Sequence, residues 1–118
     1  MTTPPVTVYY NSHCSKCRQA KAMLDERGID HSLRRYLDDP PSRDELAALL
    51  AKLGTDDPRA ILRVKQDETG RLATADAGTV LDAMAANAQL IERPIVVRGE
   101  HAVVARPPDN LLTLFEDA

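Results

Sequence analysis

The chain has 118 residues, with 15 Lys and Arg against 18 Asp and Glu, so its formal net charge at neutral pH is −3. A chain of this length builds one modest hydrophobic core, and we expect a single domain over residues 1–118. The lack of an overall positive charge argues against binding to nucleic acid or to an anionic membrane surface. Any site for an anion must therefore be local.

Both cysteines of the chain belong to one Cys-x-x-Cys motif, Cys14 and Cys17. The N-terminus shows no basic segment followed by a long apolar stretch, and no apolar run approaches the length of a membrane span. We therefore expect a cytoplasmic protein without a membrane segment, in a compartment that keeps thiols reduced. Two cysteines without a helical pair of histidines also argue against a zinc site, so we expect no bound metal.

The first predicted unit is a strand, a thiol and a helix. Residues 6–10 have β character, Cys14 follows them, and apolar residues then recur at helical spacing as far as Gly28, which is suited to end the helix. A thiol at a helix N-terminus faces unpaired backbone N–H groups and the positive end of the helix dipole, which favour the thiolate. Cys14 is therefore predicted to be a nucleophile.

Alternating polar and apolar residues at 31–37 predict a second strand, with Tyr36 as one of its alternating residues. The polar character of this segment places it at an edge of the sheet, and a β-helix-β unit makes it parallel to the first strand.

The middle of the chain is predicted to be helical. Ser42 and Glu45 form a capping box before a helix that ends at Gly54, and a short helix begins at Asp57 with proline next to it. Residues 65–78 are predicted to form a loop, and residues 79–88 a third amphipathic helix.

Two strands, at 94–98 and 101–105, form a predicted hairpin that turns at Gly99 and Glu100. A last helix is predicted from about Asp109. Its expected buried residues are Leu111, Leu112, Leu114 and Phe115.

Four local strings, together with this order of elements, resemble the glutaredoxin-dependent arsenate reductase family. The resemblance extends from Val6 to about Leu114 and implies an α/β, thioredoxin-like fold. That fold has a four-stranded mixed sheet, flanking helices and a helical insertion at about 42–90. The strings are Tyr10-Asn-Ser-His-Cys14, YLDDPPSRDEL at 36–46, Arg59-Ala-Ile-Leu-Arg63 and Ile91-Glu-Arg-Pro-Ile-Val-Val97.

The resemblance also implies a site. Cys14 attacks arsenate, and the oxyanion is bound by Arg63, Arg93 and Arg106, while Pro94 forms a cis peptide bond near the thiol. Arginine suits this task because its fork of donors pairs with two oxygens and keeps its charge. Glutathione then serves as co-substrate, arsenite is released, and glutaredoxin clears the mixed disulfide; no cofactor is bound.

Two further residues are secondary candidates for the anion site. Arg18 follows the thiol by one helical turn, and Asn11 is suited to order the loop before the thiol through its side chain. Nothing in the sequence suggests more than a monomer.

The chain departs from the family pattern at two positions. Tyr10 stands where the family frequently has a histidine, and Cys17 offers a second thiol within reach of a disulfide with Cys14. Cys17 leaves open recycling by thioredoxin and a general thiol-disulfide oxidoreductase. It also leaves open a redox-sensing transcription regulator that binds RNA polymerase. A phosphatase-like arsenate reductase is disfavoured, because its Cys-x5-Arg motif would need arginine where Ala20 stands.

Overall fold

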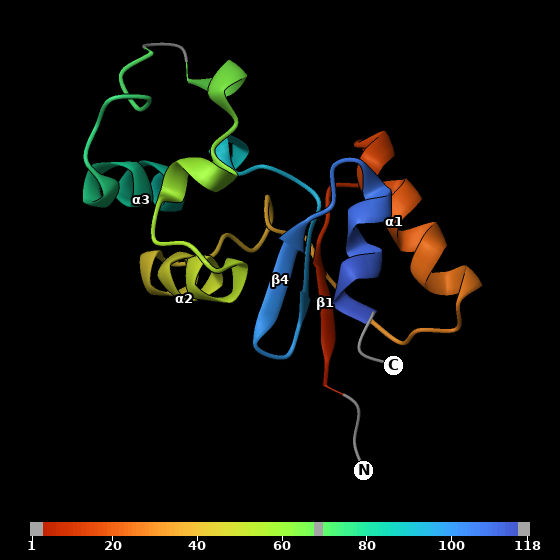
Figure 1. Cartoon of the computed structure of the whole chain (residues 1–118). Coiled ribbons are helices and arrows are strands. Elements are labelled where there is room, and N and C mark those ends of the chain that lie inside the picture. Colours follow the sequence, from red (N-terminus) through yellow and green to blue (C-terminus); the bar gives the residue numbers. More distant parts are fainter. Residues whose placement is uncertain (1–3, 68–69, 116–118) are drawn as a thin grey trace.

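The computed structural model describes residues 4–67 and 70–115. Within them the sheet has the strand order β2-β1-β3-β4 (Figure 1). The elements in chain order are β1 (Val6–Tyr9), α1 (Ser15–Glu26), β2 (Ser32–Arg34), α2 (Arg43–Leu53), the 3-10 helices η1 (Pro58–Ile61) and η2 (Val64–Gln66), α3 (Ala77–Ala86), η3 (Ala88–Leu90), β3 (Ile95–Arg98), β4 (His101–Val104) and the 3-10 helix η4 (Pro108–Phe115).

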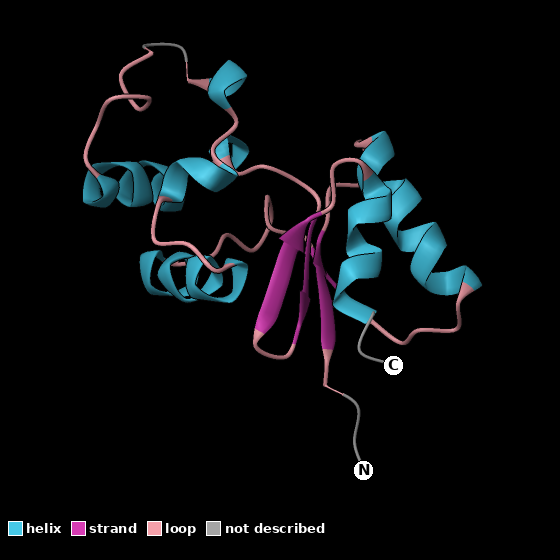
Figure 2. Ribbon diagram, in the orientation of Figure 1, coloured by secondary structure: helices cyan, strands magenta, loops and turns pink. Residues whose placement is uncertain are grey.

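Helices lie on both faces of the sheet (Figure 2), and each face packs against its own hydrophobic cluster. α1 and η4 cover one face, and α2, α3 and the short helices between them lie on the other. β3 contributes to both clusters, because successive side chains of a strand point to opposite faces of the sheet. Ile95 and Val97 belong to the cluster on the α2 side, and Val96 belongs to the cluster on the α1 side.

Two predicted pairings, the parallel pairing of the first two strands and the hairpin of the last two, are confirmed. β1 is parallel to β2 and antiparallel to β3, and β3 and β4 form a hairpin. β2 lies at an edge, and the segment between β2 and β3 is the predicted helical insertion. In this arrangement the carboxyl end of β1, the end of β4 and the start of β3 meet at one end of the sheet.

The predicted strand at 31–37 is wrong beyond Arg34. The chain turns at residues 36–38, where the N–H groups of Asp38 and Asp39 donate to the carbonyl of Arg35 at 3.0 and 2.9 Å. Aspartate favours such turns, and this turn begins before the prolines that the prediction used as its stop. The consequence is that Tyr36 is buried while Leu37 is 40% exposed.

The last helix also differs from the prediction, because η4 is a 3-10 helix. Three residues per turn align Leu111 with Leu114, which are buried, and leave Leu112 and Phe115 partly buried. The third helix begins two residues earlier than predicted, since Asp76 caps it by accepting from the N–H of Thr79 at 2.8 Å.

The edge strand β2 is tied to α2 by one ion pair. Arg34 donates to both carboxylate oxygens of Glu45, at 2.8 and 3.3 Å. Glu45 also completes the predicted capping box with Ser42, with both hydrogen bonds at 3.1 Å. The hydrogen bond from Arg34, followed by that from the Ser42 backbone, lowers the pKa of Glu45 to about 2.

We expect Glu45→Gln to reduce the free energy of unfolding at neutral pH by about 1 kcal/mol, a modest value because both side chains are partly exposed. A carboxyl whose pKa is lowered by folding stabilises the protein above its unfolded pKa, near 4.3, and loses that effect as the pH falls toward about 2. The two proteins should therefore converge in stability over that range in urea unfolding. Asp44→Asn, which removes a charge from the same helical turn, is the matched control, and a difference that persists at the acid end would contradict the ion pair.

Candidate active site

The loop before Cys14 is held by its own hydrogen bonds. The Asn11 side chain accepts from the N–H of His13 at 2.9 Å, and the Asn11 carbonyl accepts from the N–H of Cys14 at 3.0 Å. The Arg18 guanidinium reaches back one turn and donates to the carbonyl of Ser12 at 2.8 Å. Asn11 and Arg18 thus both brace the loop that presents the thiol.

Cys14 is the residue that caps the N-terminus of α1, and it is 7% exposed. Its side chain makes no capping hydrogen bond, but Cys14 lies at the positive end of the helix dipole. Burial raises the pKa of the Cys14 thiol, but the N–H of Cys17, the Cys17 thiol, the charge of Arg93 and the N–H of Lys16 lower it. The lowering effects prevail, so the pKa lies below the ordinary value and Cys14 is suited to be a thiolate.

Cys17 has the opposite character. It has no exposed surface, and both cysteines are free thiols. Burial first, and then the neighbouring Cys14, raise the pKa of Cys17 to about 12. Cys17 is therefore a neutral thiol beside a thiolate, a difference between the two cysteines that the Cys-x-x-Cys spacing alone does not specify.

A short antiparallel contact joins the helical insertion to the segment before β3. Leu62 pairs with Ile91 in an isolated β-bridge. On one side of it the N–H of Arg63 donates to the carbonyl of Leu90 at 2.7 Å, and on the other the N–H of Glu92 donates to the carbonyl of Ile61 at 2.7 Å. This contact brings a residue of the insertion beside the chain that enters β3. It is why Arg63 and Arg93, which are far apart in the sequence, lie at the same place.

Arg63, Arg93 and Arg106 line one cavity of about 330 Å³. Arg106 donates to the carbonyl of Arg93 at 3.0 Å and lies 3.9 Å from the carboxylate of Glu92. The three predicted arginines are thus gathered in one place. The other residues of the lining are Leu62, Lys65 and Glu92.

Arg93 links this cavity to the thiol. Cys14 does not line the cavity, but the charge of Arg93 acts on its sulfur. The Arg93 Nε atom is buried and, within the described part of the chain, has no hydrogen-bond partner. A buried donor without a partner is costly, and an anion bound here would satisfy it. The Arg93–Pro94 peptide bond is cis, as expected, and so is Arg106–Pro107.

Tyr36 is a residue of this site that the sequence analysis missed. It is 1% exposed, and burial raises the pKa of its hydroxyl to about 12. The charges of Arg93 and Arg63 lower that pKa and the charge of Cys14 raises it, so the hydroxyl lies within electrostatic range of the site, although Tyr36 does not line the arginine cavity. In the sequence, only its position at the start of the YLDDPPSRDEL string pointed to a role in the site. Tyr36 was instead predicted to lie in the second strand.

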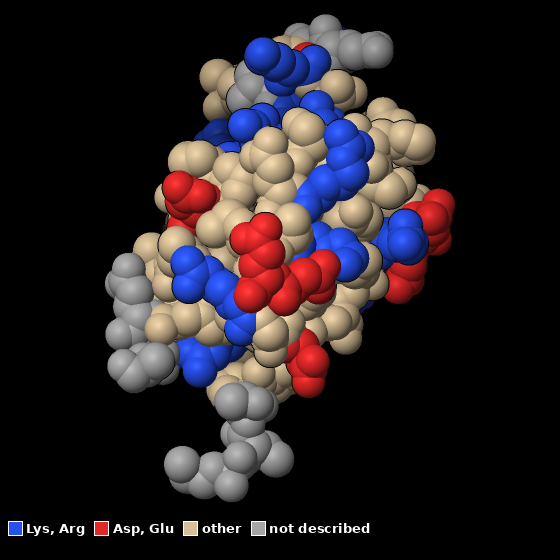
Figure 3. Space-filling view, turned by 90° about the vertical axis from the view of Figure 1, so that its right-hand side faces the viewer, with Lys and Arg blue, Asp and Glu red and all other residues tan. Residues whose placement is uncertain are grey.

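Positive side chains gather at this end of the molecule although the chain is acidic overall. In Figure 3, which views the molecule from the side of α1, Lys and Arg are more prominent than Asp and Glu in the upper part of the surface. The local anion site expected from the net charge of −3 is consistent with this arrangement.

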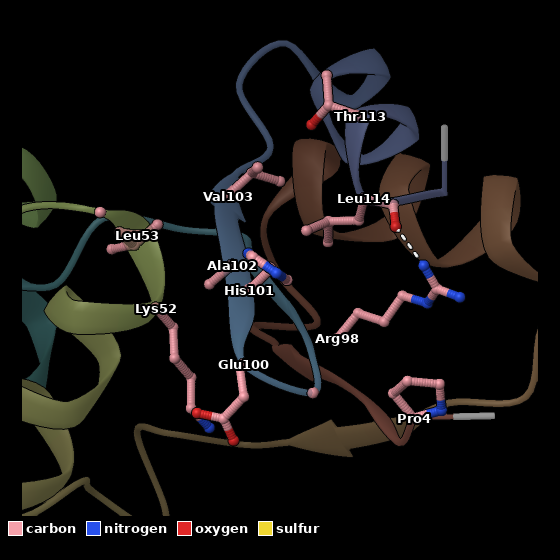
Figure 4. A pocket seen from close by; sticks show the side chains of 12 residues that line it. Pro4, Lys52, Leu53, Arg98, Glu100, His101, Ala102, Val103, Thr113 and Leu114 are labelled. Carbon is pink, nitrogen blue, oxygen red and sulfur yellow. Dashed lines mark hydrogen bonds between the residues drawn. The ribbon is translucent and has the colours of Figure 1, made fainter. Parts of the chain in front are cut away.

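A larger cavity, of about 650 Å³, lies at the opposite end of the sheet, beside the turn between β3 and β4 (Figure 4). Pro4, Lys52, Glu100 and His101 are among the residues that line it. No cysteine lines this cavity. Its arginine, Arg98, donates a hydrogen bond to the carbonyl of Leu114 at 2.7 Å. We therefore place the candidate active site at Cys14 and the arginine cavity.

Within the described residues, no helix has the length and apolar character needed to cross a bilayer. The same residues contain no group of three or more His, Cys, Asp or Glu side chains arranged to hold a metal ion.

The sheet order, the cysteine at the start of α1 and the cis-proline before β3 define a protein of the thioredoxin-like fold class. The ArsC family model matches residues 9–114, and the chain belongs to the ArsC family.

Several proteins named arsenate reductase are similar to this chain over most of their length. The arsenate reductase of Haemophilus influenzae is 37% identical over 115 residues, which cover 93% of this chain and 98% of that protein. The arsenate reductase of Neisseria meningitidis serogroup A is 38% identical over 112 residues, 92% of this chain and 96% of that one. The solved structure of an arsenate reductase from Vibrio cholerae has a TM-score of 0.87 at 35% identity and covers 95% of this chain and 98% of its own.

Proposed function

We propose that the protein is an arsenate reductase in which the Cys14 thiolate attacks arsenate bound by Arg63, Arg93 and Arg106. The observation that carries the proposal is Arg93, which lines the arginine cavity and also lowers the pKa of the Cys14 thiol. An oxyanion and a thiolate repel each other unless cations lie between them. In this proposal Arg93 holds both, and its Nε, which has no hydrogen-bond partner among the described residues, supplies a donor for the anion.

The chemistry runs in two steps. First, the Cys14 sulfur forms a bond to arsenic while one arsenate oxygen leaves as water after protonation, which gives a thiol-arsenate adduct. Second, a glutathione thiolate attacks the Cys14 sulfur, and the electron pair of the sulfur–arsenic bond stays on arsenic. Arsenic passes from the pentavalent to the trivalent state and leaves as arsenite, while Cys14 is left in a mixed disulfide that glutaredoxin reduces.

Cys17 supports an external reductant in this proposal. A thiol attacks a disulfide as its thiolate, and burial, the largest effect on Cys17, raises the pKa of its thiol and so disfavours that thiolate. This argues against thioredoxin-type recycling through a Cys14–Cys17 disulfide and against a redox-sensing regulator built on that switch. The cytoplasmic location and the monomeric state remain predictions.

The test is turnover of arsenate with glutathione and glutaredoxin, followed by NADPH consumption through glutathione reductase. We expect arsenite formation that depends on both components. Turnover with a thioredoxin system alone, or reduction of disulfide substrates without any reduction of arsenate, would overturn the assignment.

A further inference from the structure

The arginine cavity offers more than a tetrahedral oxyanion needs. An oxyanion has five heavy atoms and takes up roughly 150 Å³ if each atom occupies the volume of a water molecule. The cavity has about 330 Å³, so about half of it stays open when arsenate is bound. Two charged side chains that the arsenate step does not use, Lys65 and Glu92, line the same cavity.

The charges of the cavity change during the proposed reaction. Before the first step, the four cations of the lining face Glu92, an arsenate dianion and, outside the lining, the Cys14 thiolate on which the charge of Arg93 acts. After the step, the thiolate and the dianion are replaced by one adduct that carries a single negative charge when one of its oxygens is protonated. The cavity then holds two positive charges in excess, which favour the entry of a second anion.

Lys65 and Glu92 give the open part of the cavity one charge of each sign. Lys65 is exposed on η2 and makes no ion pair among the described residues. The Glu92 carboxylate forms a long ion pair with Arg106, 3.9 Å from its Nε and beyond hydrogen-bond distance, and its 28% exposed side chain leaves room for a second cationic partner. Both groups can therefore pair with a ligand that carries a carboxylate and an ammonium group.

We propose that Lys65 and Glu92 form the binding subsite of the reductant, a small thiol derived from an amino acid. Its carboxylate binds Lys65, its ammonium group binds Glu92, and its sulfur approaches the Cys14–arsenic adduct. The proposal rests on the proposed function, because the second step needs an external thiolate. That thiolate forms a disulfide with Cys14, and the sulfur–arsenic electron pair passes to arsenic.

A panel of thiols of different charge tests the subsite. Arsenate turnover is measured with glutathione, mercaptoacetate, cysteamine and the neutral dithiothreitol, and each kcat/KM is divided by that for dithiothreitol. For Lys65→Glu we expect the ratios for glutathione and mercaptoacetate to fall about tenfold, since a favourable charge becomes a repulsive one. For Glu92→Gln we expect the ratio for cysteamine to fall about threefold. Lys52→Glu, which changes the same charge in the cavity at the other end of the sheet, is the matched control and should keep the wild-type ratios.

Ratios in Lys65→Glu that equal those of the wild type would overturn the subsite while leaving the arsenate reductase proposal intact. Absence of turnover with every thiol would instead contradict the proposed function. In that case the binding of S-methylglutathione, measured by calorimetry, decides the subsite. Binding that weakens about tenfold in Lys65→Glu supports it, and binding that is absent or unchanged in that variant overturns it.

Discussion

Cys14→Ser is expected to abolish arsenate reduction, with a fall in kcat of roughly 10⁴-fold or more, as for other enzymes that lose their nucleophile. The hydroxyl of serine stays protonated under conditions in which the lowered pKa of Cys14 supplies a thiolate. The same variant should form no covalent adduct when it is treated with arsenate and analysed by mass spectrometry. Unfolding curves of the variant and the wild type check that the fold is kept.

Cys17→Ser is the matched control, because it removes the other thiol of the motif. We expect it to form the adduct and to keep kcat within about threefold of the wild type, since Cys17 is buried and protonated and supplies no nucleophile. Loss of adduct in Cys17→Ser together with its retention in Cys14→Ser would reverse the roles that we assign to the two cysteines.

Arg93→Met is expected to lower kcat/KM for arsenate by roughly 10²- to 10³-fold, the range found when one donor to a developing anion is removed. Two losses combine, because Arg93 lines the anion cavity and also stabilises the Cys14 thiolate. Arg93→Lys keeps the charge but not the fork of donors, so its activity should lie between those of Arg93→Met and the wild type.

Arg27→Met removes an exposed guanidinium at the far end of α1 and serves as the control for the change in net charge. It should leave kcat/KM for arsenate within about twofold of the wild type. An Arg93→Met variant that is as active as Arg27→Met would show that Arg93 does not hold the substrate.

Local patterns predicted the elements of the fold well. The capping box at Ser42 and Glu45 and the hairpin at Gly99 depend on neighbouring residues, so the sequence contains their causes. The predicted second strand was too long, because the alternation of polar and apolar residues continues past Arg34 into a turn. The turn is defined by backbone hydrogen bonds, in which the carbonyl of Arg35 accepts from two N–H groups. The 3-10 character of η4 was also missed, since apolar residues at 111, 112, 114 and 115 fit either kind of helix.

The site was predictable only in part. The helix-start position of Cys14 can be read from its neighbours, whereas Arg63, Arg93 and Arg106 were singled out through a family resemblance. Their common cavity depends on the contact between Leu62 and Ile91, which joins segments far apart in the chain. Lys65 lies outside the four strings of the resemblance, and Glu92 lies inside one of them without an assigned role, so the cavity that they line is what singles them out.

The ionisation of Cys14 is the most direct test of the site. The rate of alkylation by iodoacetamide is measured against pH for the wild type and for Arg93→Met, and mass spectrometry identifies the labelled cysteine. We expect labelling of Cys14 with a midpoint clearly below that of an ordinary thiol, about 8.5, and a higher midpoint in Arg93→Met. A midpoint at or above the ordinary value, or one that Arg93→Met leaves in place, would contradict a thiolate held against an arginine-lined anion site.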